Sequence, residues 1–384
     1  DRSVSRGLGD VYKRQTYMKQ IAERQGGRLQ MSTDTNTVLK SVDAQAALVT
    51  DEYNIRYISG FTGGEATLYI SPEHRILITD SRYTEAASKE SDFEVIEWNR
   101  QRRTEDILAE YILSDSVRCI AYEDKSMLCG DFAKLAEKLD MIERWVPAGS
   151  AFNNLRMIKK PWELECLRKA ESIGDAAFAN LLKIIKEGMT ELDVVAELEY
   201  QMRKCGGQGT SFDTIAASGL NSSMPHAVPS EKKLQNGDFV TMDFGCRYNG
   251  YCSDMTRTIV IGKADEKQKE LYNLVLRANL EAEAALHAGL RGCDVDKVAR
   301  DIIDSSIYKG CFGHGLGHSV GLFIHENPRL SPGDSTVLQP GMIETVEPGI
   351  YVPGFGGVRI EDMVIVTENG FENLAHSPKE LIEI

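Results

Sequence analysis

The sequence predicts an α+β protein of two domains: an N-terminal α/β domain, then a larger C-terminal domain made of two copies of one unit. Three observations support this prediction. Short apolar runs alternate with stretches of helical periodicity in the first third of the chain. A segment rich in proline, glycine and asparagine follows, over residues 146–161. Beyond it, an ungapped internal repeat relates two stretches of the chain.

The first residues stand apart from this pattern. Residues 1–15 contain no apolar periodicity, and the run Val4–Gln15 resembles the translation of a sequencing-library adaptor rather than the start of a natural protein. We therefore expect residues 1–15 to be a non-native or disordered tail. Both alternatives predict that these residues pack against nothing.

The N-terminal domain is expected over residues 16–150. Its strand-like apolar runs, the second and third joined by a hairpin turn at Ser71–His74, are Ala46–Val49, Thr67–Ile70, Arg75–Ile78, Phe93–Ile96 and Arg118–Tyr122. Helical spacing occurs at Thr84–Ser88, Thr104–Leu113 and Asp131–Leu139, and Thr104 is expected to cap the second of these helices. Gly60–Gly64 lacks the glycine spacing of nucleotide-binding loops, so we interpret it as a turn.

The C-terminal domain, expected over residues 151–384, begins with helical patterns. A long helix is predicted from Pro161, a favourable first-turn residue, to about Ile185, and Gly188 ends the helical stretch. Thr190–Asp193 has the form of a capping box and predicts a second helix that runs to Lys204.

An internal repeat predicts that this domain is duplicated. Leu234–Gly245 aligns with Leu338–Gly349 at an offset of 104 residues, and a leucine, a glutamine, two glycines, a threonine and an acid coincide. Further upstream, Gly188–Thr190 echoes Gly289–Arg291 at an offset of 101 residues. Two copies of a helix–helix–strand unit, each unable to bury its apolar face alone, are expected to pack around a pseudo-twofold axis.

Each copy carries a pair of acids on strand-like sequence. The first copy has Asp243 and Asp254, 11 residues apart, and the second has Glu347 and Glu361, 14 residues apart. The residues before Asp243 and Glu347 are strand-like, so these acids are predicted to point inward. Because unpaired buried charges are costly, four such carboxylates predict bound metal ions. The alternative is that they are surface acids, as Asp and Glu usually are.

A glycine-rich loop supplies histidines. The segment Cys311–Pro328 contains His314, His318 and His325, separated by glycines that let the backbone approach a ligand closely. A loop of merely solvated histidines is the alternative. Four carboxylates and one imidazole suit two divalent cations, and a water that bridges them would become a hydroxide near neutral pH and attack a carbonyl. The sequence therefore predicts hydrolysis of an amide or an ester.

Composition excludes several other classes. The chain has no run of 18 apolar residues and no signal-peptide pattern, so we expect a cytoplasmic protein with no membrane partner. Its formal net charge of -14 argues against a nucleic-acid surface. The eight cysteines are scattered without a C-x-x-C pair, which suits reduced thiols better than disulfides or a zinc knuckle.

From about Leu155 to Ile384 the chain resembles the pita-bread metallopeptidases, which include methionine aminopeptidase, aminopeptidase P and prolidase. Residues 16–150 resemble the N-terminal domain shared by the proline-specific members and creatinase. The resemblance implies a duplicated pita-bread catalytic domain behind a creatinase-like α/β domain. It assigns bridging roles to Asp254 and Glu361. The full set of implied metal ligands is Asp243, Asp254, His318, Glu347 and Glu361.

The resemblance also implies roles for residues that do not bind metal. His226, His314 and His325 would line the site, with His226 and His325 donating hydrogen bonds to the scissile carbonyl or the tetrahedral intermediate. Glu347 would pass a proton from water to the leaving proline nitrogen. Arg359 matches an arginine of the proline-specific branch and would orient ligands or bind a carboxylate; a purely structural ion pair is the alternative.

Three further positions are open to two interpretations. Ser319 stands where related sequences commonly have glycine, and its hydroxyl could touch the pocket without loss of metal binding. Tyr251 and Tyr351 follow the first acid of each copy, so they could support the ligands or simply be strand aromatics.

The leading functional hypothesis is a Xaa-Pro aminopeptidase that removes the first residue from peptides with proline in second position. It would use two divalent metal ions, with Mn²⁺ expected because the ligands are rich in oxygen, and Co²⁺ or Zn²⁺ as alternatives. A Xaa-Pro dipeptidase (prolidase) is the close alternative, because the ligands do not discriminate between the two. A catalytically inactive binding module is disfavoured because no ligand is missing. The resemblance suggests a homodimer or homotetramer.

Overall fold

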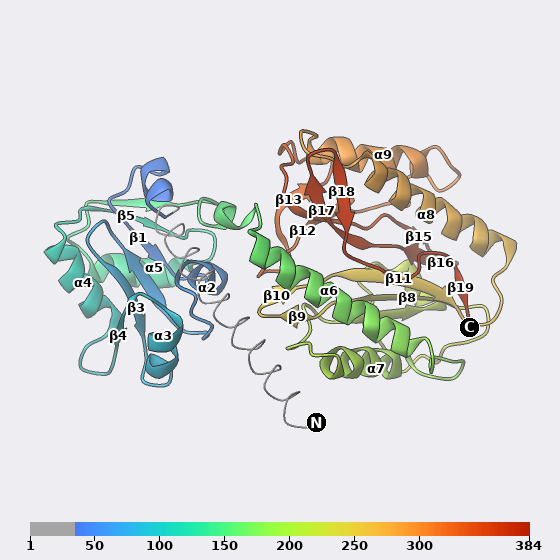
Figure 1. Cartoon of the computed structure of the whole chain (residues 1–384), viewed down its shortest axis with the longest axis horizontal. Coiled ribbons are helices and arrows are strands. Elements are labelled where there is room, and N and C mark those ends of the chain that lie inside the picture. The colour runs from blue at the N-terminus through green and yellow to red at the C-terminus, as the bar shows by residue number, and fades with distance from the viewer. Residues whose placement is uncertain (1–34) are drawn as a thin grey trace, which may run out of the picture. The chain divides into compact units, whose positions relative to one another are not determined.

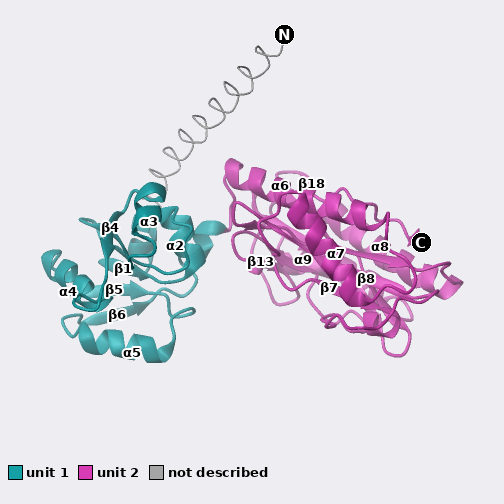
Figure 2. Cartoon of the chain, turned by 90° about the horizontal axis from the view of Figure 1, so that it is seen from below, with its two compact units in different colours: residues 1–156 teal, residues 157–384 magenta. Residues whose placement is uncertain are grey.

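The computed structural model describes residues 35–384, so the tail expected at residues 1–15 lies outside the described part of the chain. The chain divides into two units between Arg156 and Met157 (Figure 2). This division falls inside the segment 146–161 that is rich in proline and glycine. Among the described helices, none has the length and apolar character needed to cross a membrane. All eight cysteines are free thiols.

A six-stranded sheet of order β4-β3-β2-β1-β5-β6 forms the centre of the N-terminal unit. Its strands are β1 (Ala46–Val49), β2 (Thr67–Ile70), β3 (Arg75–Thr79), β4 (Glu94–Glu97), β5 (Cys119–Tyr122) and β6 (Arg144–Pro147). Strand β2 pairs antiparallel with β1 and β3, and the other neighbours are parallel. The five predicted strands and the hairpin are confirmed. Strand β6 was not predicted, because it is short and runs into the proline-rich segment.

Besides the helical residues 35–41, this unit contains α2 (Glu52–Ser59), α3 (Thr84–Glu90), α4 (Thr104–Ser114) and α5 (Cys129–Lys138). Helix α2 was not predicted from the apolar pattern. It is defined by its ends, since the Asp51 carboxylate accepts hydrogen bonds from two backbone N–H groups and Gly60 has a φ of 77°. The prediction that Thr104 caps α4 is wrong by one residue, because the N-cap is Arg103.

The C-terminal unit consists of two similar halves (Figure 1). The first half contains α6 (Pro161–Leu181), α7 (Glu191–Lys204), β7 (Ile215–Ser218), β8 (Phe239–Phe244), β9 (Arg247–Tyr248), β10 (Tyr251–Cys252) and β11 (Met255–Val260). The second half contains α8 (Glu266–Ala285), α9 (Gly292–Asp304), β12 (Gly317–Ser319), β13 (Glu326–Leu330), β14 (Ile343–Val346), β15 (Gly349–Val352), β16 (Gly356–Arg359), β17 (Asp362–Thr367) and β18 (Gly370–Asn373). The short strand β19 (Ile382–Glu383) then pairs with β11 of the first half.

The duplication fixes where the acids lie. Strand β8 pairs antiparallel with β11, and β14 pairs in the same way with β17. Asp243 lies in β8 and Asp254 directly precedes β11, whereas Glu347 directly follows β14 and Glu361 directly precedes β17. In Figure 1 these strands lie between the helix pair α6–α7 and the helix pair α8–α9. The two helix–helix–strand units predicted from the repeat are confirmed.

Each helix pair buries its own apolar core against the strands. Residues such as Phe178, Leu198 and Met242 fill the core beneath α6 and α7, and a second core packs beneath α8 and α9. The capping box predicted at Thr190 is present, since Thr190 and Asp193 exchange hydrogen bonds between side chain and backbone. Helix α6 begins at Pro161 as predicted but ends at Leu181, before the predicted end, and turns follow. These cores hold the strands that carry the acids.

Candidate metal centre

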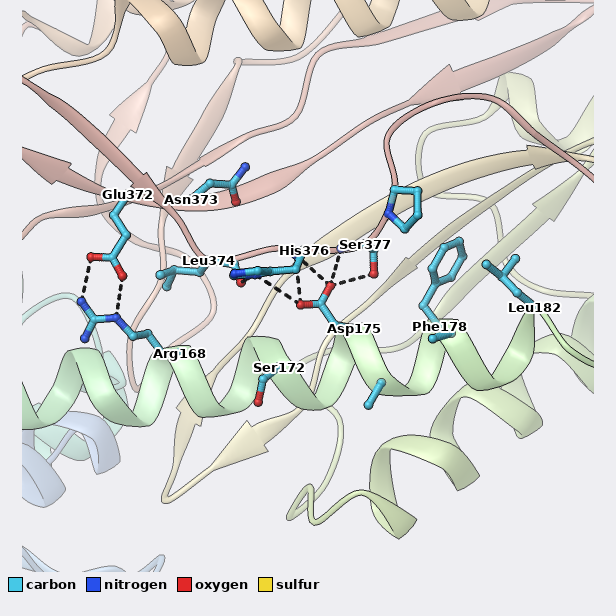
Figure 3. Close-up of a pocket in the computed structure, with 13 residues that line it drawn as sticks. Arg168, Ser172, Asp175, Phe178, Leu182, Glu372, Asn373, Leu374, His376 and Ser377 are labelled. Atoms are coloured by element: carbon cyan, nitrogen blue, oxygen red, sulfur yellow. Dashed lines mark hydrogen bonds and ion pairs between the residues drawn. The ribbon is translucent and has the colours of Figure 1, made fainter.

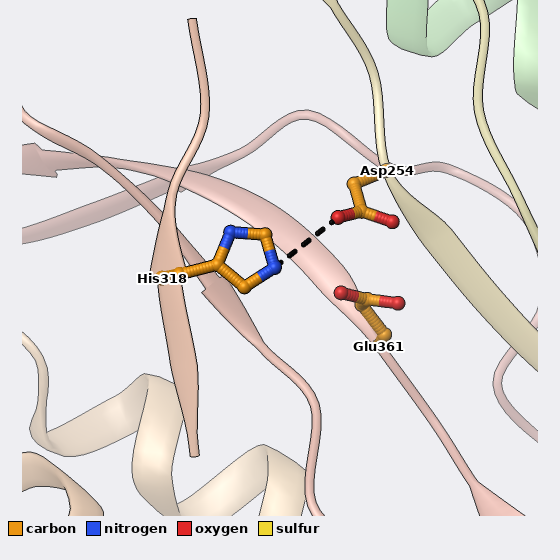
Figure 4. A group of neighbouring side chains, drawn as sticks. All are labelled: Asp254, His318 and Glu361. Carbon is orange, nitrogen blue, oxygen red and sulfur yellow. Dashed lines mark ion pairs between the residues drawn. The ribbon is translucent and has the colours of Figure 1, made fainter. Parts of the chain in front are cut away.

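Three buried side chains from distant parts of the sequence converge between the two halves of the C-terminal unit. They are Asp254, His318 and Glu361, and one ligand atom from each lies within 4.8 Å of the others (Figure 4). The Nε2 atom of His318 is 3.5 Å from Oδ2 of Asp254. Two carboxylates and an imidazole at this spacing can hold a divalent cation.

The other two predicted ligands border this group. The Oε1 atom of Glu347 is 3.6 Å from Nε2 of His318. Asp243 places Oδ2 2.7 Å from Nη2 of Arg359, while its Oδ1 atom is buried and has no hydrogen-bond partner among the described residues. A buried carboxylate oxygen without a partner costs free energy unless a cation or a water meets it. The structure thus brings all five predicted ligands into one region.

The carboxylates repel one another strongly. Burial raises the pKa of Asp254 well above its ordinary value, and the charges of Glu361 and Asp243 raise it further. Burial and the neighbouring acids act on the pKa of Glu361 in the same way. Burial also raises the pKa of Glu347 to about 8, although the nearby Arg359 opposes this shift. Bound cations would offset the repulsion among four carboxylates that share one guanidinium. This charge balance is typical of a metal site.

His318 has the protonation state that metal binding requires. Burial lowers its pKa to about 3, so the imidazole is neutral. Its Nδ1 atom lies 3.2 Å from the carbonyl oxygen of Ser319, which can only accept a hydrogen bond. The proton is therefore on Nδ1, and the lone pair of Nε2 faces Asp254 and Glu347. This arrangement, with a backbone carbonyl fixing the tautomer, is typical of a metal-binding histidine.

Two threonines orient the acids and were not identified from the sequence. The hydroxyl of Thr256 donates to Oε2 of Glu361 at 2.6 Å. The hydroxyl of Thr345 accepts a hydrogen bond from the backbone N–H of His318 at 3.0 Å and lies 3.4 Å from Oε1 of Glu347. Each threonine is two residues from a predicted ligand. Because residues two apart on a strand face the same side, this spacing could have identified both threonines from the sequence.

A second chain of contacts starts from Arg359. Its Nη1 atom donates to the hydroxyl of Tyr351 at 2.7 Å, and this hydroxyl is 3.0 Å from Nε2 of His314. Burial lowers the pKa of His314 to about 4, so this ring is also neutral. Tyr351 is therefore part of the site. Tyr251, by contrast, donates to buried Glu163 at 2.8 Å.

The remaining predicted histidines lie at the exposed side of the site. The rings of His325 and His318 have centroids 4.6 Å apart. Burial lowers the pKa of His325, and the charge of Arg329 lowers it further. His226 is exposed, but its charge acts on the pKa of both His314 and His325. His226 and His325, both predicted to bind substrate, are thus accessible to solvent.

Arg329 is a residue that the sequence did not single out. It lies in β13 directly opposite His318 in β12, and its charge acts on the pKa of His318, His325 and Glu347. The guanidinium of Arg329 forms no ion pair among residues 35–384, although the backbone N–H of Arg329 donates to Asp334 and the charge of Arg329 lowers the pKa of that acid. A half-buried arginine without an ion pair can bind an anion.

The stability of the metal-free protein should depend on pH. The raised pKa values of Glu347, Asp254 and Glu361 mean that the folded protein holds protons which the unfolded chain releases, so stability falls as the pH rises through 8. The pKa values of the buried His314 and His318 are lowered, so these residues make stability rise with pH. This opposite effect is confined to pH values below 6.5. We expect the Tm without metal to fall between pH 6.5 and 8, by calorimetry. A divalent cation should remove most of this decline in Tm. A Tm that rises between pH 6.5 and 8 would contradict the claim that ionisation of the clustered acids destabilises the metal-free protein.

A separate cavity of about 820 Å³ lies along α6 and contains none of these residues (Figure 3). Its charged groups have hydrogen-bond partners in the wall of the cavity. Arg168 forms two hydrogen bonds with Glu372, and Asp175 accepts from the hydroxyl and backbone N–H of Ser377. The cavity and the acidic cluster are thus different places.

Comparisons with known proteins agree with this geometry. Residues 165–368 match Metallopeptidase family M24, and residues 35–158 match the Creatinase/Prolidase N-terminal domain. The structure resembles a Xaa-Pro dipeptidase from Bacillus anthracis, with a TM-score of 0.90 and 41% identity over 93% of this chain and 100% of the other. A Xaa-Pro dipeptidase from Pyrococcus horikoshii is 38% identical over 89% of this chain and 95% of its own length.

An X-Pro aminopeptidase from Thermotoga maritima is also similar, with a TM-score of 0.85 and 36% identity over 91% of this chain and 100% of the other. The predicted fold, a pita-bread domain preceded by a creatinase-like domain, is confirmed. A metallopeptidase of this kind implies divalent metal ions, and the cluster of Asp254, His318 and Glu361 suits them. The chain therefore belongs to metallopeptidase family M24, in its proline-specific branch.

Proposed function

We propose that this protein is a Xaa-Pro dipeptidase, a prolidase that hydrolyses dipeptides with a C-terminal proline. The observation that carries the proposal is the convergence of four acids and a neutral imidazole in a chain that matches Xaa-Pro dipeptidases over nearly its whole length. The leading hypothesis from the sequence was an aminopeptidase. The similar dipeptidases favour the dipeptidase alternative over it.

The proposed site holds two divalent cations, because four carboxylates and one guanidinium leave a surplus of negative charge that two such ions offset. The residues that would hold them are Asp254, Glu361 and His318, together with the bordering Asp243 and Glu347. Mn²⁺ is the first candidate because most ligands are oxygens. When bound, the ions supply Lewis acidity and a water of lowered pKa.

The protein's own groups would handle protons and orientation. Glu347, whose side chain is 17% exposed and lies beside His318, would as the ionised carboxylate take a proton from the attacking water and deliver it to the proline nitrogen. His325 and His226 would donate hydrogen bonds to the oxygen on which negative charge develops. The chain from Arg359 through Tyr351 to His314 would hold that side of the pocket rigid.

Recognition of a dipeptide requires a group that binds the free carboxylate of its proline. Arg329 is a candidate, because it lies opposite His318 in the paired strands and its charge lowers the pKa of His325. An aminopeptidase has to leave this position open for the rest of the peptide. We therefore propose that Arg329 contributes to the preference for dipeptides.

Product analysis tests the proposed function. The purified protein, reconstituted with Mn²⁺, would be given Gly-Pro and a series of Gly-Pro-Xaa tripeptides, and released glycine would be measured. We expect rapid turnover of Gly-Pro and little turnover of the tripeptides. Rapid cleavage of the tripeptides would instead identify an aminopeptidase, and no turnover of either would refute a Xaa-Pro peptidase.

Replacing His325 by alanine should reduce kcat without removing metal. The imidazole lies next to His318 but is proposed to act on the substrate, so its loss removes a transition-state hydrogen-bond donor. We expect kcat on Gly-Pro to fall by about 10² or more. Metal content, measured by mass spectrometry of the dialysed protein, should match the parent protein. A loss of metal would make His325 a ligand.

Replacing Arg329 by methionine should mainly raise KM. If the guanidinium binds the proline carboxylate, its loss removes a charge-assisted hydrogen bond of about 1.5–3 kcal/mol, which corresponds to a rise in KM of about 10–100-fold for Gly-Pro. Gly-Pro amide, which lacks the carboxylate, serves as the control substrate and should be affected little. Equal losses on both substrates would show that Arg329 acts elsewhere.

A further inference from the structure

A buried lysine contacts the two strands that flank the loop between His318 and His325. Lys159 directly precedes the N-cap of α6, and its side chain is only 1% exposed. Its Nζ atom donates to the hydroxyl of Ser319 at 2.8 Å and lies 3.3 Å from Oε2 of Glu326. The Glu326 side chain is 4% exposed. A lysine is rarely buried to this degree unless it is paired.

The two partners of Lys159 are the two ends of one loop. Ser319 ends β12 and Glu326 begins β13, and the two residues pair across the strands, where the register shifts next to His318. The carbonyl of Ser319 accepts the Nδ1 hydrogen bond of His318. At the other end, Glu326 follows His325 directly. Lys159 thus contacts the residue next to His318, which is Ser319, and the residue next to His325, which is Glu326.

The carboxylate of Glu326 also organises the interior of the loop. Its Oε1 atom accepts a hydrogen bond from the backbone N–H of Phe323 at 3.2 Å. A Cβ added to Gly321 would lie 2.4 Å from Oε2 of Glu326, so the backbone there wraps closely around the carboxylate. The path of the loop between His318 and His325 therefore depends on where Glu326 is held.

We propose that Lys159, through Ser319 and Glu326, is a positioning residue that fixes His318 for metal binding and His325 for the substrate. This inference rests on the proposed metal site and adds a contact that supports it. It also accounts for Ser319: its hydroxyl meets the buried lysine, not the pocket. Groups that orient a metal-binding histidine typically change metal affinity or activity by about 10–100-fold when removed.

A nearby acid supplies a matched control. Glu344 in β14 is fully buried, feels the charge of Lys159, and has no hydrogen-bond partner for either carboxylate oxygen among the described residues. Burial raises its pKa well above the ordinary value, and the charge of Lys159 opposes this shift. Glu344→Gln therefore changes a buried acid beside the same lysine without touching the two ends of the loop.

The test uses the full chain loaded with Co²⁺, whose visible absorption bands report ligand geometry. Lys159→Met should lower Co²⁺ affinity by about 10–100-fold, change the intensity of the visible bands, and lower kcat on Gly-Pro with little change in KM. Ser319→Ala should shift the same properties in the same direction by less. Glu344→Gln should match the parent protein in all of them. Wild-type affinity and spectrum in Lys159→Met would overturn the proposal.

A double variant separates positioning from stability. Lys159→Met alone leaves the Glu326 carboxylate without the lysine, which can prevent folding. Lys159→Met with Glu326→Leu removes both charges and should fold, but its Co²⁺ spectrum should still be altered. A normal spectrum in the double variant would mean that the pair is only structural. The metal measurements do not need a peptide substrate, so they stand even if the parent protein fails to cleave Gly-Pro.

Discussion

Asp254→Asn should abolish peptidase activity, with a loss in kcat/KM well above 10²-fold, because it removes the carboxylate at the centre of the cluster. Removing groups that only orient a ligand costs about 10–100-fold, and Asp254 is itself a proposed ligand to both ions. Its Oδ2 atom lies 3.5 Å from Nε2 of His318, and its nearest ligand partners are within 4.8 Å. An amide of the same shape carries no negative charge and cannot hold two cations together.

The same substitution should make the metal-free protein more stable. Burial and the charges of Glu361, Asp243 and Glu347 raise the pKa of Asp254, which means that its ionised form is unfavourable in the empty cluster. Asparagine removes that penalty, so the Tm without metal should rise while the increase in Tm on adding Mn²⁺ should shrink. Scanning calorimetry and metal analysis would measure both effects.

The control is Glu344→Gln, which replaces another fully buried acid of the same unit that holds none of the ligand positions. It should keep activity, metal content and the metal-induced rise in Tm. If Asp254→Asn retained the hydrolysis rate and metal content of the parent protein, the assignment of the cluster as a dinuclear site would be wrong.

Arg257→Met should destabilise the C-terminal unit by about 3–5 kcal/mol, the usual cost of breaking a buried charge pair. Arg257 is 1% exposed, and its Nη2 atom is 2.6 Å from Oδ1 of Asp362. Each of its five N–H groups has an acceptor, and besides Asp362 these are the backbone carbonyls of Thr256, Glu361, Ser377 and Pro378. Methionine fills similar space but satisfies none of them.

Urea denaturation of the full chain, following the transition of residues 157–384, would measure this loss. Arg168→Met is the matched control, because Arg168 also forms two hydrogen bonds with an acid, Glu372, but the side chains are 41% and 46% exposed. An exposed pair contributes only about 0–1 kcal/mol. Equal effects of the two variants would show that burial does not set the cost of losing Arg257.

Much of the site could be anticipated because its residues repeat along the chain. The coincidence of Asp243 with Glu347 in the aligned segments, and a second acid after each, predicted two equivalent strand pairs, and the structure has them in β8–β11 and β14–β17. The capping box at Thr190 and the hairpin at Ser71–His74 were likewise predictable, because local hydrogen bonds determine them. Helix α2 and strand β6 were missed because they are short and carry no clear apolar period.

The sequence by itself determined the two-domain α+β organisation, the duplication and the types of ligand, since apolar periodicity, turn residues and repeats are written along the chain. Only the tertiary structure decided which side chains support the predicted ligands. Thr256, Thr345, Arg257, Arg329 and Lys159 owe their places to contacts with residues far away in sequence or on a neighbouring strand. The physical reason is burial: a polar side chain inside the protein needs partners, and the three-dimensional packing decides which partners lie within reach.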